Sequence, residues 1–514
     1  MIVGNAQKGY KMSDLQLHGR LKIYTTTEEF TDENIMDEVG KALGIHMFNV
    51  AEEEYLYWYR RGLQPILERT KQVRPEINHK IVENHSQEIV TFKDGYFLSE
   101  SAYYKARKEE KKVTEGVRKL NEYLYLSGKQ EADNEIVDWF HTVGLGVCYV
   151  EASEPVKAYS IDPRQAFVVY SRRPGNEPVM GVNMVLNGDK TLFDVFTKEW
   201  IWHMEGVGAV VKIDVDIPTV SYPTRIVGEK EPNLMGEIPI IEYQYDQNRM
   251  SAFEPVLSLL DMLNELESDA QNAIDQFVQS LMIFYNCELG EDENGKPITP
   301  AYIREAGAIF LKSIGQDKAD LKILSEQLDQ TQTQVLKQNI YEQILHIVGM
   351  PAPANNSGST GDNVGAVIWR AGWYQAETYA RNTEDLFKKS NKHFDRCLMK
   401  ILALKLKKPL KLNLEDFEIQ INRNETTNIL SKTQAALNMR ELGFSPEIAF
   451  ARTGITNDPV ADVENSRKYI DLKWGGADDT TGLRRTEYTG ERITGNGERR
   501  PGGEDNTRVA TERI

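Results

Sequence analysis

Residues 251–282 read SAFEPVLSLLDMLNELESDAQNAIDQFVQSLM and form one uninterrupted amphipathic run. Apolar residues recur every three to four positions, the spacing of one face of an α-helix. A helix over the whole run would be roughly 48 Å long, which is too long for an ordinary compact domain. The run holds six acidic residues and no Lys or Arg, so the rest of its surface is acidic. The apolar positions are Val256, Leu260, Leu263, Leu266, Ala270, Ile274, Phe277 and Leu281.

Two further helices and a loop rich in small residues are expected downstream. The second helix is expected over residues 328–348, where Gly349 and Pro351 give a strong stop signal. A third helix of about 40 residues, roughly 60 Å long, is expected from Val364 to Leu404. The loop before it, residues 353–365, contains no Lys, no Arg and no large apolar side chain. Such lengths suit a shaft or a channel better than an enzyme pocket. The apolar face of the second helix comprises Leu336, Ile340, Ile344 and Ile347.

The segments before residue 251 favour helices followed by strands. Thr26 and Glu29 fit a capping box for a helix through Leu43, and Asn49 with Glu52 fits another for a second, aromatic-rich helix. Between residues 146 and 245 the pattern changes to short β-rich segments, which predicts a small antiparallel sheet. The dipeptide Asn187-Gly188 is a hairpin signal. The expected strands are 147–151, 166–171, 179–186, 192–196 and 211–215.

The segments after the third helix are shorter. Residues 416–422 resemble one strand, and residues 426–472 resemble two or three short helices. Beyond Trp474 the chain is dominated by Gly, Arg, Glu, Thr and Asp, and it has too little apolar surface to offset its chain entropy. The expected fold class is α+β, mainly α, with a mobile tail.

The bulk composition restricts the function classes. The net charge of −17 argues against a protein that grips nucleic acid electrostatically, because gripping needs basic clusters at the phosphates. Three scattered Cys residues fit a reducing compartment. Neither an apolar stretch of about 18 residues nor a secretory leader pattern is present, so we expect no membrane partner.

No catalytic constellation is convincing, so we expect no enzyme, no cofactor and no metal. The GxxxxGK[ST], HExxH, CxxC and GxSxG patterns are missing. Glu265, Asp269 and Asp275 could be considered as metal ligands, but no His lies near them in sequence, and a solvated acidic face is the favoured interpretation.

The chain resembles the tailed-bacteriophage portal protein family, the head–tail connector, over residues 50–470. Each motif is degenerate, and their order and spacing carry the resemblance. The loop before the third helix has no basic residue, so a lysine ring that touches DNA does not carry over. The tail after Trp474 has no counterpart. The motifs are Tyr59, Gly62, Ile66, Asn78, Asn84, Ile89-Val90, Gly95-Tyr96, Gly236-Glu237-Ile238-Pro239, Asp261, Asn264, Ser268-Asp269, Gly349 and Pro351.

The resemblance implies an elongated subunit of a ring, usually of twelve copies, at one capsid vertex of the virion, assembled in the host cytoplasm. Double-stranded DNA would pass through its channel, driven by a separate terminase motor. Head-completion or tail adaptors and the major capsid and scaffolding proteins would be further partners. The implied parts are a wing (1–250), a first stem helix (251–282), a clip (283–327), a second stem helix (328–348), a tunnel loop (349–363), a long central helix with a wing return (364–424), a helical crown (425–475) and a flexible tail (476–514).

Candidate site residues follow from these parts. Glu265, Asp269 and Asp275 would form an acidic channel face, which repels phosphates and gives DNA no deep electrostatic trap. Leu263 and Phe277 would pack the stem. Clip residues Glu291 and Asp292 would dock the motor. The tunnel loop would contact DNA through Asn355, Asn356, Ser357, Ser359, Thr360 and Asn363.

Two alternatives stay open at this point. The first is a phage minor head or scaffolding-type protein with long helices and no channel, which need not form a closed ring. The second is a metal-dependent nuclease that uses the acidic residues of the 251–282 helix. Loss of DNA cleavage on changing Asp269 to Asn would favour the nuclease.

Overall fold

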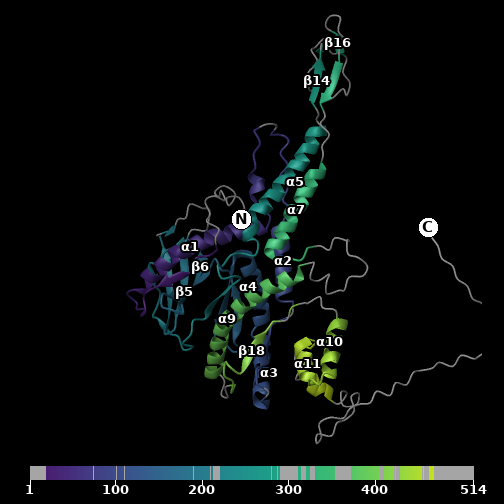
Figure 1. Ribbon diagram of the computed structural model, residues 1–514. Helices are drawn as coiled ribbons and strands as arrows, with labels where there is room; N and C mark the ends of the chain where they lie inside the picture. The colour runs from purple at the N-terminus through teal and green to yellow at the C-terminus, as the bar shows by residue number, and fades with distance from the viewer. Residues whose placement is uncertain are drawn as a thin grey trace, which may run out of the picture. The chain divides into compact units, whose positions relative to one another are not determined.

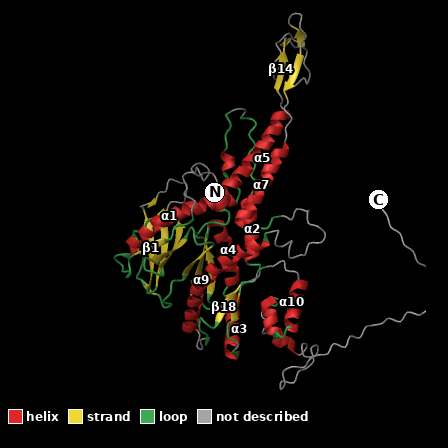
Figure 2. Cartoon of the chain, in the orientation of Figure 1, coloured by secondary structure: helices red, strands yellow, loops and turns green. Residues whose placement is uncertain are grey.

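A computed structural model gives the fold of the chain. It describes residues 19–72, 75–99, 101–108, 110–188, 190–208, 210–211, 220–278, 281–285, 287–289, 311–313, 320–324, 330–352, 372–405, 410–421, 423, 429–453, 455–456 and 462–467. Helix is the commonest structure among these residues and strands form several sheets, so the fold is α+β and mainly α (Figure 2). The chain divides into two compact units, Met1–Thr426 and Thr427–Ile514.

A seven-stranded sheet is the main β element of the first unit. Its order is β1-β5-β6-β7-β8-β11, and β12 also pairs with β8. β1 runs parallel to β5, whereas the other pairs are antiparallel. The strands are β1 (Ile23–Thr25), β5 (Ala166–Ser171), β6 (Pro178–Asn187), β7 (Lys190–Thr197), β8 (Trp200–Val207), β11 (Arg225–Ile226) and β12 (Glu231–Pro232).

The sequence predicts only part of this sheet. β5 spans the expected residues, and the Asn187-Gly188 turn joins β6 to β7, with Asn187 opposite Lys190. Gly188 has a φ of +64°, which glycine adopts without strain. Strands β8 and β1 are not among the predicted strands, so the sheet is larger than the predicted one, and it is mixed in direction because β1 runs parallel to β5. A separate pair joins β9 (Val210–Val211) to β10 (Val220–Ser221).

The two faces of the seven-stranded sheet are covered differently. Helix α1 (Ile35–Arg60) covers one face, where its apolar residues share a core with Phe167 and Val169 of β5. Val168 points to the other face and packs with Ile240. That residue belongs to a three-stranded sheet with the order β13 (Ile240–Gln244), β3 (Leu145–Glu151) and β4 (Lys157–Ile161). The two sheets approach so closely at Gly181 that a Cβ atom there would lie 3.0 Å from the Cβ of Ile240.

Two predicted helix boundaries are wrong at helix α1. The sequence predicts one helix ending at Leu43 and another capped by Asn49, but α1 runs through both positions without a break. Asn49 is buried, and its amide bonds the backbone of Leu21, accepting from its N–H at 2.7 Å and donating to its carbonyl at 2.8 Å. A tertiary contact therefore uses the side chain that the sequence pattern assigned to a cap.

The largest hydrophobic core of the first unit lies between several helices, the three-stranded sheet and a further pair of strands. Helix α9 (Trp373–Lys405) has 33 residues and packs beside β13. Residues 364–371 of the predicted third helix lie outside the described residues. Cys148 and Cys397 are buried free thiols in this core. The remaining elements of this core are α2 (His85–Phe97), α3 (Lys111–Leu126), α4 (Lys129–Val143) and the antiparallel pair β2 (Tyr103–Ala106) and β18 (Phe417–Gln420).

Helices α5 (Leu257–Val278) and α7 (Gln330–Val348) lie side by side (Figure 1). α5 has 22 residues, so the predicted helix over 251–282 is too long at both ends. At the start, Ser251 and Glu254 form a capping box before the short helix η2 (Glu254–Val256). At the end, the β-prone residues from Leu281 form β14. Four strands lie between α5 and α7 in the sequence: β14 (Leu281–Tyr285) pairs with β17 (Asp320–Leu324), and β15 (Cys287–Leu289) pairs with β16 (Leu311–Ser313).

The second unit contains short helices, as the sequence predicts for residues 426–472. Helices α10 (Ile429–Glu441) and α11 (Pro446–Thr453) pack together, and residues 462–467 are also helical. Residues 468–514, which include the predicted mobile tail, lie outside the described residues.

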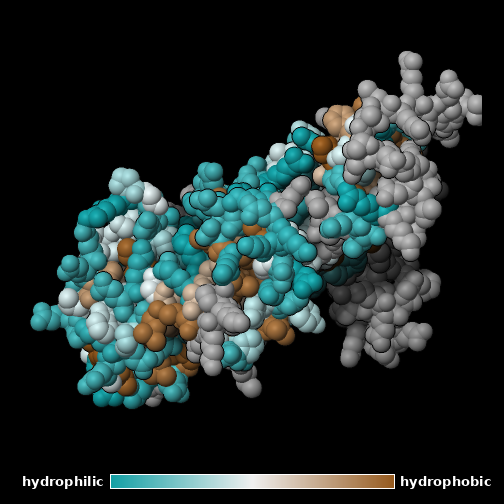
Figure 3. All heavy atoms as spheres, turned by 90° about the horizontal axis from the view of Figure 1, so that it is seen from below, coloured by the Kyte–Doolittle hydropathy of each residue, from teal (hydrophilic) through white to brown (hydrophobic). Residues whose placement is uncertain are grey.

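The described surface in Figure 3 is mainly hydrophilic and is interrupted by several apolar patches. Among the helices that the structure describes, none combines the length and the apolar character needed to cross a membrane.

Candidate functional site

The α5–α7 pair has an apolar core inside the subunit. Leu263 is fully buried there, so this residue of the predicted stem packing acts within one chain. Leu336 and Ile347, predicted on the apolar face of α7, are 42% and 43% exposed. The buried face of α7 is therefore rotated from the predicted one. The core between the two helices consists of Leu257, Leu260, Leu263, Ile340, Ile344, Leu345 and Val348.

Beyond Leu263 the buried face of α5 becomes polar. Asn264, Ser268 and Asn272 follow one another at one-turn intervals, and all three are buried. Their side chains accept hydrogen bonds from alternate backbone N–H groups of segment 79–83. Every fourth residue of a helix lies about 6 Å further along its axis, and every second residue of an extended chain lies about 6.6 Å further along. The spacing of the three side chains on α5 therefore matches the spacing of the three N–H groups in segment 79–83. The pairs are Asn264 with Glu83 at 2.8 Å, Ser268 with Ile81 at 3.0 Å and Asn272 with His79 at 2.8 Å.

Two of the three predicted channel carboxylates contact the same stretch of chain that precedes α2. Asp269 accepts a hydrogen bond from Arg69 at 2.6 Å, and Asp275 lies 2.5 Å from His79. Burial raises the pKa of Asp269, but the Arg69 guanidinium, together with Asn272 and Lys71, outweighs burial, so the pKa is lowered. Glu265 is exposed. Part of the acidic face of α5 therefore contacts other segments of the same subunit.

Lys337 ties the same stretch to α7. Its ammonium group lies 2.5 Å from a carboxylate oxygen of Glu83 and 2.7 Å from one of Glu267. One cation therefore joins α5, α7 and segment 79–83. The roles of Lys337, Arg69 and Asn272 are not predictable from the sequence, because each contact joins residues far apart in the chain and no local pattern signals it.

Tyr59 and Asp261 form a further contact between α1 and α5. The Tyr59 hydroxyl donates a hydrogen bond to Asp261 at 2.8 Å. Burial raises the pKa of Asp261 to about 6, although the hydrogen bond from Tyr59 opposes this rise. Both residues belong to the motifs that carry the family resemblance, and the structure brings them together.

Several predicted site residues lie outside the described part of the chain. Phe277 lies in α5, but its side chain is not among those described. Glu291 and Asp292 of the predicted clip are also outside, as are the six predicted loop residues Asn355, Asn356, Ser357, Ser359, Thr360 and Asn363. Within the described residues, no group of three or more His, Cys, Asp or Glu side chains is placed to hold a metal ion.

Comparison with known proteins identifies the family. Residues 50–471 match the family described as phage portal protein, SPP1 Gp6-like. The match spans most of the chain and includes α5, α7 and α9, so the chain belongs to this portal protein family. It is therefore a portal or connector protein, and this family consists of structural proteins.

Solved structures give more distant matches. One is described as "Neck of native GTA particle computed with C12 symmetry"; it is 11% identical, covers 72% of this chain and 89% of its own, and has a TM-score of 0.40. Another, "Neck of empty GTA particle computed with C6 symmetry", is 11% identical, covers 72% and 90%, and has a TM-score of 0.38. No curated protein matches the chain.

Proposed function

We propose that this chain is the subunit of a closed portal ring, whose channel passes double-stranded DNA during packaging and ejection. The observation that carries the proposal is the paired helices α5 and α7, with strands inserted between them, in a chain of the portal family. The ring would occupy one vertex of the capsid in the virion and would assemble in the host cytoplasm.

The proposed parts follow the order of the elements. α5 and α7 are the stem helices, the strands between them belong to the clip (283–327), and the segment 349–363 is the tunnel loop. The large sheet and its covering helices are the wing, α9 is the central helix, residues 425–475 are the crown and residues 476–514 are the tail.

Exposed apolar side chains on the stem support contact between copies. Met262 and Ile274 of α5 are 40% and 38% exposed, and Val335 and Leu336 of α7 are 56% and 42% exposed. Contiguous exposed apolar surface marks interaction sites on proteins, and the proposal assigns these side chains to such a surface. A contact between α5 of one copy and α7 of the next is heterologous, and it gives a closed ring when its rotation closes.

The proposed channel holds DNA weakly. Glu265 is exposed on α5 and would add negative charge to the wall, whereas Asp269 is paired with Arg69 and Asp275 contacts the His79 ring within the subunit. An acidic wall avoids the counterion release that holds DNA on basic surfaces. The loop residues 355–363 would contact phosphates through small polar side chains, without Lys or Arg.

The proposed docking partners act at the clip and around the ring. The clip, including Glu291 and Asp292, would bind the terminase motor first and the head-completion or tail adaptors later. The major capsid and scaffolding proteins would surround the ring at the vertex. The motor would supply the ATPase, because the chain lacks a P-loop sequence.

Native mass spectrometry of the purified full chain tests the proposed ring. We expect one dominant assembly whose mass is a whole multiple of the 58.6 kDa subunit, with twelve copies as the family norm. A monomer over a wide range of concentration would defeat the proposal.

A further inference from the structure

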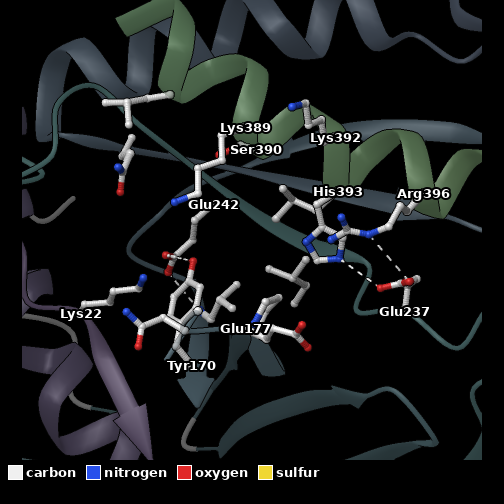
Figure 4. A pocket seen from close by; sticks show the side chains of 18 of the residues that line it. Lys22, Tyr170, Glu177, Glu237, Glu242, Lys389, Ser390, Lys392, His393 and Arg396 are labelled. Carbon is white, nitrogen blue, oxygen red and sulfur yellow. Dashed lines mark hydrogen bonds and ion pairs between the residues drawn. The ribbon is translucent and has the colours of Figure 1, made fainter. Parts of the chain in front are cut away.

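A pocket of about 580 Å³ lies between the seven-stranded sheet, β13 and helix α9 (Figure 4). It belongs to the first unit and is separate from the stem. Three carboxylates line it, from Glu177, Glu237 and Glu242. Cationic side chains outnumber them: Lys22, Lys198, Lys389, Lys392 and Arg396.

The three carboxylates already have partners. Glu242 accepts hydrogen bonds from Arg249 at 2.6 Å and from the Tyr170 hydroxyl at 2.8 Å. Glu177 lies 3.1 Å from Lys198, and Glu237 lies 2.9 Å from Lys400. The excess positive charge of the pocket is therefore concentrated on the lysines that these carboxylates do not neutralise.

Lys22 and Lys389 are the two of these lysines that best fit an anion site. Figure 4 shows both side chains directed into the same part of the pocket, near Tyr170 and Glu242. Among the described residues, neither ammonium group has a carboxylate within ion-pair distance; Lys22 lies instead 4.0 Å from the centre of the Tyr170 ring. Burial lowers the pKa of Lys22, and so do the positive charges of Arg249 and Lys389, while the Glu242 carboxylate opposes the fall only in part. Like charges held together in this way are stabilised by a bound anion.

His393 adds a buried polar atom at the other end of the pocket. The residue is 8% exposed, and its Nε2 atom has no hydrogen-bond partner among the described residues. The nearest carboxylate oxygen, from Glu237, is 3.8 Å away. Burial lowers the pKa of His393 to about 4, so the ring is neutral and can present one N–H group to a ligand.

We propose that this pocket binds a multiply charged oxyanion of the phosphate class, held mainly between Lys22 and Lys389. The five cationic side chains of the lining outnumber its three carboxylates, and the resulting positive charge favours a bound anion. Lysine binds phosphate as a point charge. The unpartnered Nε2 atom of His393 offers a separate polar contact at the other end of the pocket. The phosphate can be free or part of nucleic acid, since both present the same chemistry. The inference goes beyond ring formation and does not depend on it.

Isothermal titration calorimetry of the full chain tests this site, with sodium phosphate and a short DNA duplex as separate ligands. We expect saturable phosphate binding that weakens about tenfold or more in Lys389→Gln and in Lys22→Gln, because each loses one charge-assisted contact. Lys388→Gln is the matched control, because Lys388 neighbours Lys389, pairs with Glu384 at 2.5 Å and does not line the pocket. Thermal melting of each variant confirms that it is folded.

The two ligands distinguish the sources of phosphate. Duplex binding that depends on Lys389 and is displaced by phosphate indicates nucleic acid, whereas binding of phosphate alone indicates a free ion; both support the site. Equal binding by the Lys389 and Lys388 variants would overturn it, as would no saturable binding of either ligand. Loss of self-association in the Lys389 variant without any phosphate binding would also overturn it, and would assign the pocket to carboxylates of a second copy.

Discussion

The Oδ1 atom of Asn264 accepts a hydrogen bond from the backbone N–H of Glu83 at 2.8 Å, across 181 positions of sequence. The amide group of Asn264 also donates to Gln64, so one side chain on α5 fixes two points of the chain that precedes α2. Ser268 and Asn272 repeat the contact one and two turns further along. The helix that we assign to the stem is therefore held by a ladder of side-chain to backbone hydrogen bonds as well as by apolar packing.

Replacing Asn264 with Ala is expected to destabilise the subunit by about 1–3 kcal/mol, because the partly buried N–H of Glu83 and the buried side chain of Gln64 both lose their partner. Urea unfolding measures the effect, and amide hydrogen exchange at Glu83 should become faster. Glu265→Ala is the control, because Glu265 is the next residue and is exposed; its change should stay within about 0.5 kcal/mol. Equal losses of stability in the two variants would show that the ladder contributes nothing.

Met262 and Leu263 are neighbours with different expected roles. Leu263→Ala should cost about 2–5 kcal/mol of folding stability, because it leaves a cavity in the α5–α7 core. Met262→Asp, and likewise Val335→Asp, should leave the subunit folded and abolish the ring, because a charge would enter the proposed contact between copies. Circular dichroism follows the fold, and size-exclusion chromatography with light scattering follows assembly.

Tyr125→Asp is the control for these stem variants. Tyr125 is 70% exposed on α3, away from the helix pair. Intact rings in the Met262 and Val335 variants would place the contact between copies elsewhere on the subunit.

Glu53 is expected to make stability depend on pH. It is fully buried, neither carboxyl oxygen has a hydrogen-bond partner among the described residues, and burial raises its pKa to about 8. A carboxyl group whose pKa is raised by folding binds its proton more tightly in the folded state, so stability falls as pH rises from about 5 to about 8. Glu53→Gln does not ionise, and its free energy of unfolding should rise relative to wild type over that range.

Urea unfolding at several pH values measures this difference, with Glu33→Gln as an exposed control. Parallel pH profiles for wild type and Glu53→Gln would mean that Glu53 stays in one protonation state.

The loop is expected to touch DNA weakly. Deleting residues 355–360 should spare ring assembly and reduce DNA packaging or retention in the head. Placing Lys at Ser357 and Ser359 should add a drag that depends on salt, because the ring repeats each phosphate contact. Packaging assays at several ionic strengths measure both effects. Normal packaging by the deletion, together with no salt response in the Lys variant, would remove the loop from the channel.

The clip is expected to bind the packaging motor. Glu291→Lys combined with Asp292→Lys should weaken motor binding in a pull-down and leave the ring intact. Deleting residues 476–514 is the control, because the tail is not assigned to any contact and its loss should affect neither property. Motor binding at wild-type strength by the clip variant would remove this assignment.

Sequence patterns predict local structure here better than distant contacts. The β6–β7 hairpin is predictable because the Asn187-Gly188 turn carries its own conformational preference. Asn49 has equally good cap chemistry, yet it lies inside α1, because its amide bonds Leu21, 28 positions away. The resemblance marks Asn264 and Ser268, but their role needs the fold, since segment 79–83 becomes their partner only when the chain is folded.

The central claim is that copies of this chain close into a ring with a channel bordered by the α5–α7 helices. Cryo-electron microscopy of the purified full chain tests it most directly. We predict a closed ring in which α5 of each copy contacts α7 of the next through Met262 and Val335, around an opening wide enough for duplex DNA. Open assemblies, monomers, or a closed ring without a central opening would contradict the account.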